Sequence, residues 1–333
     1  MAIKIKQCEL FEVDELLKFI DNEWKKDHIF TRDRELFDWQ HKSEKCYNFV
    51  LAKEGEEILG VLGYIPTSQY SPKLEINNEI WLAIWKIKDG VNKPGLGLML
   101  LNYLKKTLNN PTICSLGLSK EVVPIYKALK YQVGTLSHRA FFNQDMTRFS
   151  IASPNGKHKV KVYNNNFSYE IVDGMRPLSN TEESSLFTSN PKKDREYLEG
   201  RYFNHPRYKY RSCFIYDGNN KLLVAFIFRE IKVYDANIAR VVDSFGESLI
   251  QSKYNGVISK FITDNSFEYL DMVSNLKDEP NSGFLEACDE IIIPNYFEPF
   301  IKENVKVDFA YKTNASHDLV IYRGDSDQDR PNI

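Results

Sequence analysis

Residues 88–106 read "KDGVNKPGLGLMLLNYLKK". A proline and two glycines, Gly95 and Gly97, stand directly before an apolar run with helical spacing, and the apolar segment 79–87 before them is typical of a buried strand. Glycine destabilises the first turn of a helix, so the presence of two glycines here indicates a role other than helix formation. A glycine turn between a strand and a helix exposes N–H groups at the positive end of the helix. The stretch therefore predicts an anion site, with phosphate as its natural occupant.

The glycine pattern differs from two common phosphate-binding loops. Leu98 and Met99 follow the second glycine, where the G-x-x-x-x-G-K-[ST] loop has Lys and then Ser or Thr. Leu100 stands where the dinucleotide-binding pattern has its third glycine. A tight turn without a ligand explains the same residues, so both interpretations stay open at this point.

Composition limits the class of protein. The 333 residues are enough for two modest cores, and the formal net charge of −2 argues against a nucleic-acid binder that works by bulk electrostatics. The N-terminal residues show no apolar core of a signal peptide, and no segment is long and apolar enough to span a bilayer. The cysteines show no metal-ligand spacing and no C-x-x-C pair: Cys8, Cys46, Cys114, Cys213 and Cys288. We expect a soluble cytoplasmic protein without a metal site or membrane insertion.

Hydrophobic periodicity predicts two lobes of an α/β protein. Residues 3–143 have the order β-α-α-β-β-β-α-β-α-β, and the polar, Asn-rich residues 146–168 are expected to join the lobes. The second lobe repeats part of this order, with a hairpin around Asp217, a strand, a helix and another strand. A short helix over 282–290 and a late strand over 317–325 complete it. The expected organisation is therefore a first domain over 1–145, a linker over 146–168 and a second domain over 169–333.

The order of elements and two motifs together resemble the GNAT superfamily of acyl-CoA-dependent N-acyltransferases. The family's loop reads R/Q-x-x-G-x-G/A, and residues 92–97 match it with Asn92 in place of Arg or Gln. The family's next helix commonly reads A-x-x-L-Y-x-K-L-G-F, and residues 122–131 keep its tyrosine, Tyr126, but lose its lysine and glycine. The resemblance covers the first lobe and implies a mixed sheet, with a second GNAT-like lobe that is degenerate.

The resemblance implies acyl-CoA as co-substrate. In such folds the fourth and fifth strands splay apart, and the exposed backbone of the fourth pairs with the pantetheine arm. A backbone N–H near Lys86 or Ile87 would face the thioester carbonyl as the oxyanion forms. The coenzyme-binding residues implied in this way are Trp85, Lys86, Ile87, Asn92, Lys93, Gly95, Leu96, Gly97 and Leu98.

The sequence offers several candidates for the catalytic groups of the first lobe. Tyr126 stands where the family often places the proton donor for the leaving thiolate, although a packed aromatic on an amphipathic helix is the alternative. For the base, Asp89 could merely cap the turn after the fourth strand. The histidines His28, His41 and His138 have no decisive partner in the sequence. An amine of lowered pKa could also lose its proton to water.

The second lobe is expected to bind the acceptor, because its strand-to-turn segment 239–247 lacks the G-x-G pattern. Asp243 at the end of that strand could hold an amine as a catalytic residue, with a simple helix N-cap as the alternative. Arginines and tyrosines interleave over 195–211 and suit a nucleobase and its phosphates, or else form a solvated surface helix. The C-terminal residues 322–333 offer many partners for hydroxyl groups, or else form a disordered tail. The substrate-binding candidates are Arg201, Tyr202, Arg207, Asp329 and Arg330.

Taken together, the two lobes and the C-terminal motif are similar to bacterial two-lobed GNAT-type enzymes. These acylate the amine of nucleotide-linked amino sugars for surface polysaccharides, such as lipopolysaccharide or capsule. The resemblance therefore implies transfer of an acetyl or hydroxyacyl group, such as hydroxybutyryl, to a dTDP-type amino deoxysugar. Two alternatives remain open: acetylation of a peptide, polyamine or antibiotic amine, and a non-catalytic sensor or scaffold that binds coenzyme A. In each case the expected partners are small molecules rather than nucleic acid.

Overall fold

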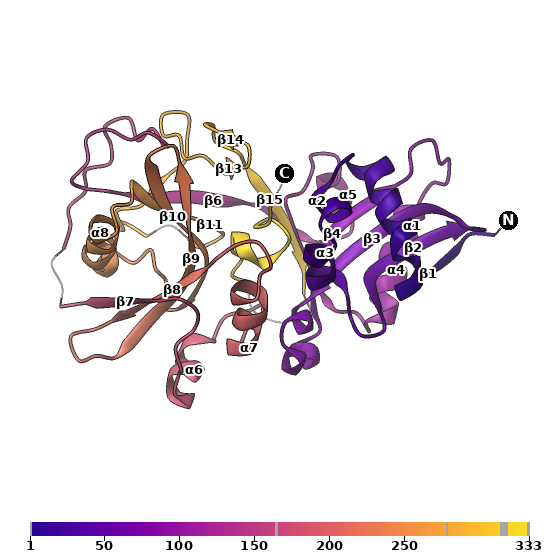
Figure 1. Cartoon of the computed structure of the whole chain (residues 1–333), viewed down its shortest axis with the longest axis horizontal. Helices are drawn as coiled ribbons and strands as arrows, with labels where there is room; N and C mark the ends of the chain where they lie inside the picture. The colour runs from indigo at the N-terminus through magenta and orange to yellow at the C-terminus, as the bar shows by residue number, and fades with distance from the viewer. Residues whose placement is uncertain (1, 164–165, 278, 314–318, 332–333) are drawn as a thin grey trace.

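The computed structural model describes residues 2–163, 166–277, 279–313 and 319–331. They form two lobes that share one continuous mixed sheet (Figure 1). Along the sheet the strands follow the order β1-β2-β3-β4-β5-β15-β6-β11-β10-β9-β8-β7. The strands contributed by the first part of the chain are β1 (Lys4–Glu9), β2 (Cys46–Glu54), β3 (Glu57–Pro66), β4 (Glu79–Ile87), β5 (Thr112–Leu116) and β6 (Gln132–Phe142).

Helices cover both faces of the sheet in the first lobe, because its central strands are apolar on both sides. In β2, Phe49 and Leu51 pack in the cluster that contains α1, α2 and α3, whereas Val50 and Ala52 pack with α4 and α5. The predicted order of the first lobe is confirmed, with α2 as a short addition. Its helices are α1 (Val13–Phe19), α2 (Ile29–Arg32), α3 (Arg34–His41), α4 (Leu96–Thr107) and α5 (Val123–Ala128).

The second lobe repeats the arrangement of the first, as its sequence pattern predicts. In each lobe a helix connects two parallel neighbouring strands: α4 connects β4 to β5, and α8 connects β10 to β11. None of the helices in the described residues is both long and apolar enough to cross a membrane. The second-lobe elements are β7 (Ser168–Val172), α6 (Asn180–Leu186), α7 (Arg195–Leu198), β8 (Arg211–Tyr216), β9 (Leu222–Val233), β10 (Ala236–Gly246), α8 (Asn255–Asp264) and β11 (Tyr269–Ser274).

The C-terminal part departs from the predicted elements. The helix expected over 282–290 is wrong, since these residues contain the short strand β12 (Leu285–Glu286), which pairs with β6. The strand expected over 317–325 is also wrong in its described part, 319–325, which forms a single bridge and a 3₁₀ turn (Arg323–Asp325); residues 317–318 lie outside the described residues. The late strand is β15 (Val307–Lys312), and a small hairpin of β13 (Tyr296–Phe297) and β14 (Phe300–Ile301) precedes it.

Strand β15 carries the end of the chain back into the first lobe. It lies between β5 and β6 and pairs with both strands, so the first-lobe sheet is completed from the far end of the sequence (Figure 1). Strand β6 belongs to both lobes, because residues 132–136 pair with β15 and residues 137–142 pair with β11. The sheet therefore passes from one lobe to the other along β6, before the polar stretch 146–168 begins.

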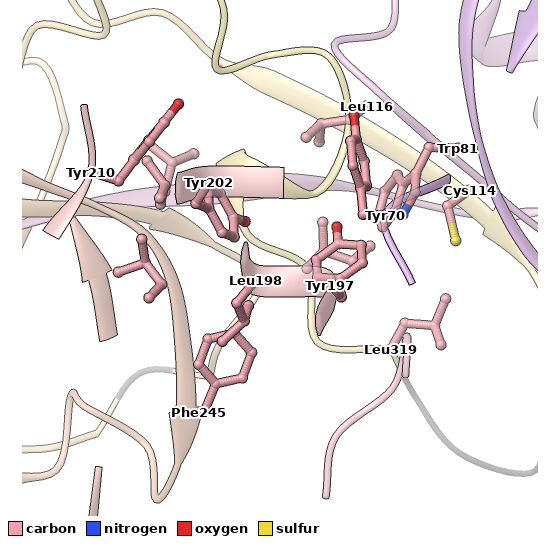
Figure 2. Packing of buried hydrophobic residues seen from close by; sticks show 14 of the residues in the cluster. Tyr70, Trp81, Cys114, Leu116, Tyr197, Leu198, Tyr202, Tyr210, Phe245 and Leu319 are labelled. Atoms are coloured by element: carbon pink, nitrogen blue, oxygen red, sulfur yellow. The ribbon is translucent and has the colours of Figure 1, made fainter. Parts of the chain in front are cut away.

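An apolar cluster between the lobes holds them together. Figure 2 shows Tyr70, Trp81 and Leu116 of the first lobe facing Tyr197 and other aromatic side chains of the second. These four side chains are each less than a tenth exposed, so the cluster forms a continuous core across the boundary between the lobes. Burial of this apolar surface fixes how the two lobes lie relative to each other.

Candidate active site

Strands β4 and β5 pair over only part of their length. Their parallel pairing ends at Leu82 and Ser115, although β4 continues. Just beyond this point β4 contains an extra residue, because Leu62 of β3 lies opposite Trp85 while Tyr64 lies opposite Leu82. Such a bulge bends a strand, and the rest of β4 pairs with β3 but with no other strand among the described residues. We call this opening the first fork; it leaves one backbone edge of β4 available to an extended ligand.

The glycine turn before α4 has the geometry that an anion site needs. Gly95 has a φ of +83°, in the left-handed region that favours glycine, and no side chain caps the helix. A Cβ at Gly97 would lie 3.2 Å from the indole Nε1 of Trp85. The N–H of Leu96 donates to the carbonyl of Lys93 (3.2 Å). Within the described residues the next two N–H groups, of Gly97 and Leu98, have no such partner and remain available to an anion.

A cavity of about 400 Å³ lies beside this turn, at the open end of the first fork. Its mostly apolar lining suits the methylene-rich arm of a coenzyme, while the helix end suits its phosphates. Lys86 pairs with Asp89 (2.6 Å), and Asn92 and Lys93 are exposed in the loop beside the cavity. The residues that line it come from β4, α4 and α5: Trp85, Ile87, Gly95, Gly97, Leu98, Val122 and Ile125.

Tyr126 lies where the paired part of the fork ends. Its side chain is 1% exposed, and a hydrogen bond joins it to Ser115, the last residue of β5 that pairs with β4. Its ring packs edge-on against Trp85, at 6.0 Å between centroids. Burial raises the pKa of Tyr126 to about 12, so the hydroxyl stays protonated near neutral pH. The tyrosine is thus packed, as the alternative interpretation expects, and also able to donate a proton.

The second lobe contains a matching fork, in which Asp243 lies. The β10–β11 pairing ends at Val241 and Met272, and a bulge follows in β10. Asp243 is fully buried there and accepts hydrogen bonds from Lys193 Nζ (2.7 Å) and from the Tyr202 hydroxyl (2.9 Å). Burial raises its pKa to about 6 even though Lys193 acts in the opposite direction. Helix α8 begins only at Asn255, so the alternative role of Asp243 as an N-cap is wrong.

The C-terminal tail, which we define as residues 319–331, fills this second fork. Tyr322 forms a backbone bridge to Ser274 at the end of β11. Asp325 lies 2.5 Å from Lys193, which therefore sits between two buried carboxylates. Most of the tail is buried, so the alternative of a disordered tail is wrong for these residues; residues 332–333 lie outside the described part. The C-terminal tail thus fills the fork of the second lobe, whereas the first fork stays open.

The residues expected to bind substrate take part in contacts within the protein. Nη2 of Arg201 donates to the carbonyl of Ser326 in the tail (2.8 Å), and Asp329 accepts from the hydroxyl of Tyr210 (2.6 Å). Arg207, by contrast, is exposed and bonds Asp33 of the first lobe (2.7 Å). Four of the five are buried or half-buried where the lobes and the tail meet: Arg201, Tyr202, Asp329 and Arg330.

The histidines considered as bases are buried. Burial lowers the pKa of His28 to about 3 and that of His41 to about 4, so both are neutral near pH 7. His138 lies 2.9 Å from the Asp271 carboxylate, in the polar interior of the second lobe. Asp89 is exposed and paired with Lys86. Of the possibilities given by the sequence, loss of the amine proton directly to water therefore remains.

Glu79, the first residue of β4, is a buried acid that the sequence analysis missed. It lines a cavity of about 600 Å³ in the first lobe, and its carboxylate accepts the backbone N–H of Lys192 in the second lobe (2.7 Å). Burial raises its pKa to about 7. The sequence feature that could have identified Glu79 is its position at the start of a mainly apolar strand. A charged side chain is unusual there.

Comparison with known proteins supports the fold. No model of a known protein family and no curated protein sequence matches the chain. A GCN5-related N-acetyltransferase from Anabaena variabilis is 13% identical with a TM-score of 0.55, over 93% of this chain and 72% of that one. A probable N-acyltransferase from Enterococcus faecalis is 9% identical with a TM-score of 0.53, over the same shares. At such identities the likeness shows the fold alone: both lobes belong to a GNAT-like α/β architecture.

The raised pKa of Glu79 predicts a pH-dependent stability. Its folded pKa lies above its ordinary value, so the folded chain loses stability as the pH rises from about 5 to about 7. Glu79→Gln removes this loss and should increase the free energy of unfolding by about 1–3 kcal/mol more at pH 8 than at pH 5. Urea denaturation at both pH values measures it, with exposed Glu75→Gln as the control. Equal effects of Glu79→Gln at the two pH values would contradict the assignment.

Proposed function

We propose that the protein is an acyl-CoA-dependent N-acyltransferase whose reaction takes place at the first fork. The observation that carries the proposal is the contrast between two similar forks in one chain. The second fork is occupied by Lys193 and the tail, whereas the first combines a free strand edge, a bare helix end and an apolar cavity. These are the three features that an extended, partly apolar ligand with phosphates at one end requires.

The residues of the first fork account for each step of acyl transfer. The N–H groups of Gly97 and Leu98 hold the pyrophosphate, and the free edge of β4 holds the amides of the pantetheine arm. A backbone N–H near Ile87 stabilises the oxyanion, and one such donor contributes about 3–4 kcal/mol to lowering the barrier. The amine nitrogen attacks the thioester carbon, so that a C–N bond forms and the C–S bond breaks. Tyr126 protonates the leaving thiolate and regains a proton from solvent, which takes up the one that the amine releases.

Replacement of Tyr126 by Phe tests its role as proton donor. Tyr126→Phe should lower kcat roughly 10²-fold, because the hydroxyl acts in a step, and should leave the affinity for coenzyme A unchanged. Free-thiol release measures turnover and calorimetry measures binding. The matched control is Tyr131→Phe, since the Tyr131 ring lies 5.0 Å away but its buried hydroxyl has no partner among the described residues. A kcat of Tyr126→Phe within a factor of two of the parent value would show that Tyr126 only packs and is not the proton donor.

We further propose that the acceptor is a nucleotide-linked amino deoxysugar of the dTDP type, as in bacterial surface polysaccharide synthesis. A cavity of about 870 Å³ in the second lobe supports this, because aromatic and basic residues of the predicted cluster line it, among them His205, Tyr208, Tyr210 and Arg211. The Nδ1 atom of His205 accepts two backbone N–H groups, which leaves Nε2–H as a buried donor without a partner in the described part of the chain. Such a donor suits a carbonyl of a nucleobase.

A panel of amines distinguishes this acceptor from the alternatives. Acetyl-CoA and hydroxybutyryl-CoA are each offered with a dTDP-linked amino sugar, the free amino sugar, a polyamine, a peptide amine and an antibiotic amine. The expected kcat/KM for the nucleotide-linked sugar exceeds that for the free sugar by about tenfold or more. Equal rates on the two sugars, or activity only on another amine, would contradict the acceptor proposal. Thiol release with none of the amines would favour a sensor or scaffold instead.

A further inference from the structure

We infer that Gln328, in the C-terminal tail, binds the acceptor amine at the first fork and orients it for attack. The inference rests on the proposed function and adds a specificity-determining residue to it. This residue comes from the opposite end of the chain from the coenzyme site, and nothing in the sequence pattern around the fork points to it.

The side chain of Gln328 lies at the end of β5. Its Nε2 approaches the carbonyl oxygen of Leu116, the last residue of that strand, at 3.5 Å. The amide also covers Gly117, where a Cβ would come within 2.5 Å of Nε2. Gly117 begins the connection from β5 to α5, the helix that carries Tyr126. A residue of the tail is thus placed against the strand that forms one arm of the first fork.

Hydrogen bonds to Ser326 and Asp329 hold the tail in place on both sides of Gln328. Before it, the carbonyl of Ser326 accepts a hydrogen bond from buried Arg201. After it, the carboxylate of Asp329 accepts from Tyr210 at 2.6 Å and from Arg229 at 3.1 Å. The neighbouring residues of the tail are buried, whereas Gln328 itself is half-buried. Its amide is therefore presented in one position, so that binding through it costs little ordering entropy.

The hydrogen bonds of the amide determine which of its atoms is free. Nε2 donates to the Leu116 carbonyl and to the Asp327 carboxylate (3.2 Å), which uses both of its N–H groups. The amide orientation follows from these two acceptors. Oε1 has no hydrogen-bond partner among the described residues, so it is the atom available to a ligand. An amine that donates one N–H to this oxygen keeps its lone pair for the thioester carbon, and a hydrogen bond of this kind restricts its approach.

The inference is tested with Gln328→Ala, acetyl-CoA and a dTDP-linked amino sugar. Gln328→Ala should lower kcat/KM for the amine about tenfold, mainly through KM, because one directional hydrogen bond is lost. The KM for acetyl-CoA and the slow thiol release to water in the absence of amine should not change, since neither involves the amine. The control is Gln251→Ala, which removes another half-buried glutamine amide from the second lobe and should leave all three values unchanged.

The outcomes separate this inference from the proposed function. If the parent protein releases no thiol with any amine of the panel, the proposed function fails and the inference fails with it. If the parent is active and Gln328→Ala keeps its kcat/KM for the amine, the inference alone is wrong. If Gln328→Ala does not fold, as shown by circular dichroism, Gln328→Asn keeps the amide but withdraws it by one methylene. That variant should raise the KM for the amine alone, and an unchanged value would overturn the inference.

Discussion

Everything proposed for this protein depends on one constraint, the early end of the pairing between β4 and β5. The two strands pair at four positions, up to Leu82 and Ser115, before the bulge in β4 turns the rest of that strand away. A fully paired β4 would have no free backbone edge, and β5 would cover the cavity beside Trp85. The opening also brings the hydroxyl of Tyr126 to the point where the strands part. The start of α4, with Gly95 and Gly97, lies beside the same opening, so the backbone supplies most of the groups that the proposed coenzyme site uses.

The second lobe shows how the same architecture behaves when the opening is filled. Its β10 carries an equivalent bulge, but Lys193 and Asp325 occupy the space beside Asp243. Removing one partner of a buried ion pair typically costs about 3–5 kcal/mol, so these contacts hold the tail firmly in place. The tail in turn continues to Gln328, which reaches β5 of the first lobe. The filling of the second fork and the position of Gln328 beside the first fork are thus consequences of the same contacts.

The sequence predicts the first lobe well because its signals are local. The alternation within β2 and the glycine turn before α4 can be interpreted without knowledge of the rest of the chain, whereas the early end of the β4–β5 pairing was expected only from a family resemblance. The wrong predictions concern segments whose structure is determined by contacts with residues far away in the sequence. Leu319 and Ile321 alternate as in a strand but pack between the lobes, while β15 has the same alternation and enters the sheet. Likewise, nothing near Arg201 indicates that its partner is the carbonyl of Ser326 in the tail.

We propose that acyl-CoA binds at the first fork through the backbone of β4 and the first turn of α4. Amide hydrogen exchange of the whole chain, followed by mass spectrometry with and without acetyl-CoA, tests this most directly, because it reports on the backbone groups themselves. We expect slower exchange of amides 83–87 and 96–98 in the presence of acetyl-CoA, with no change over residues 242–246 in the second fork. Unchanged exchange in the first fork, or protection confined to the second, would contradict it.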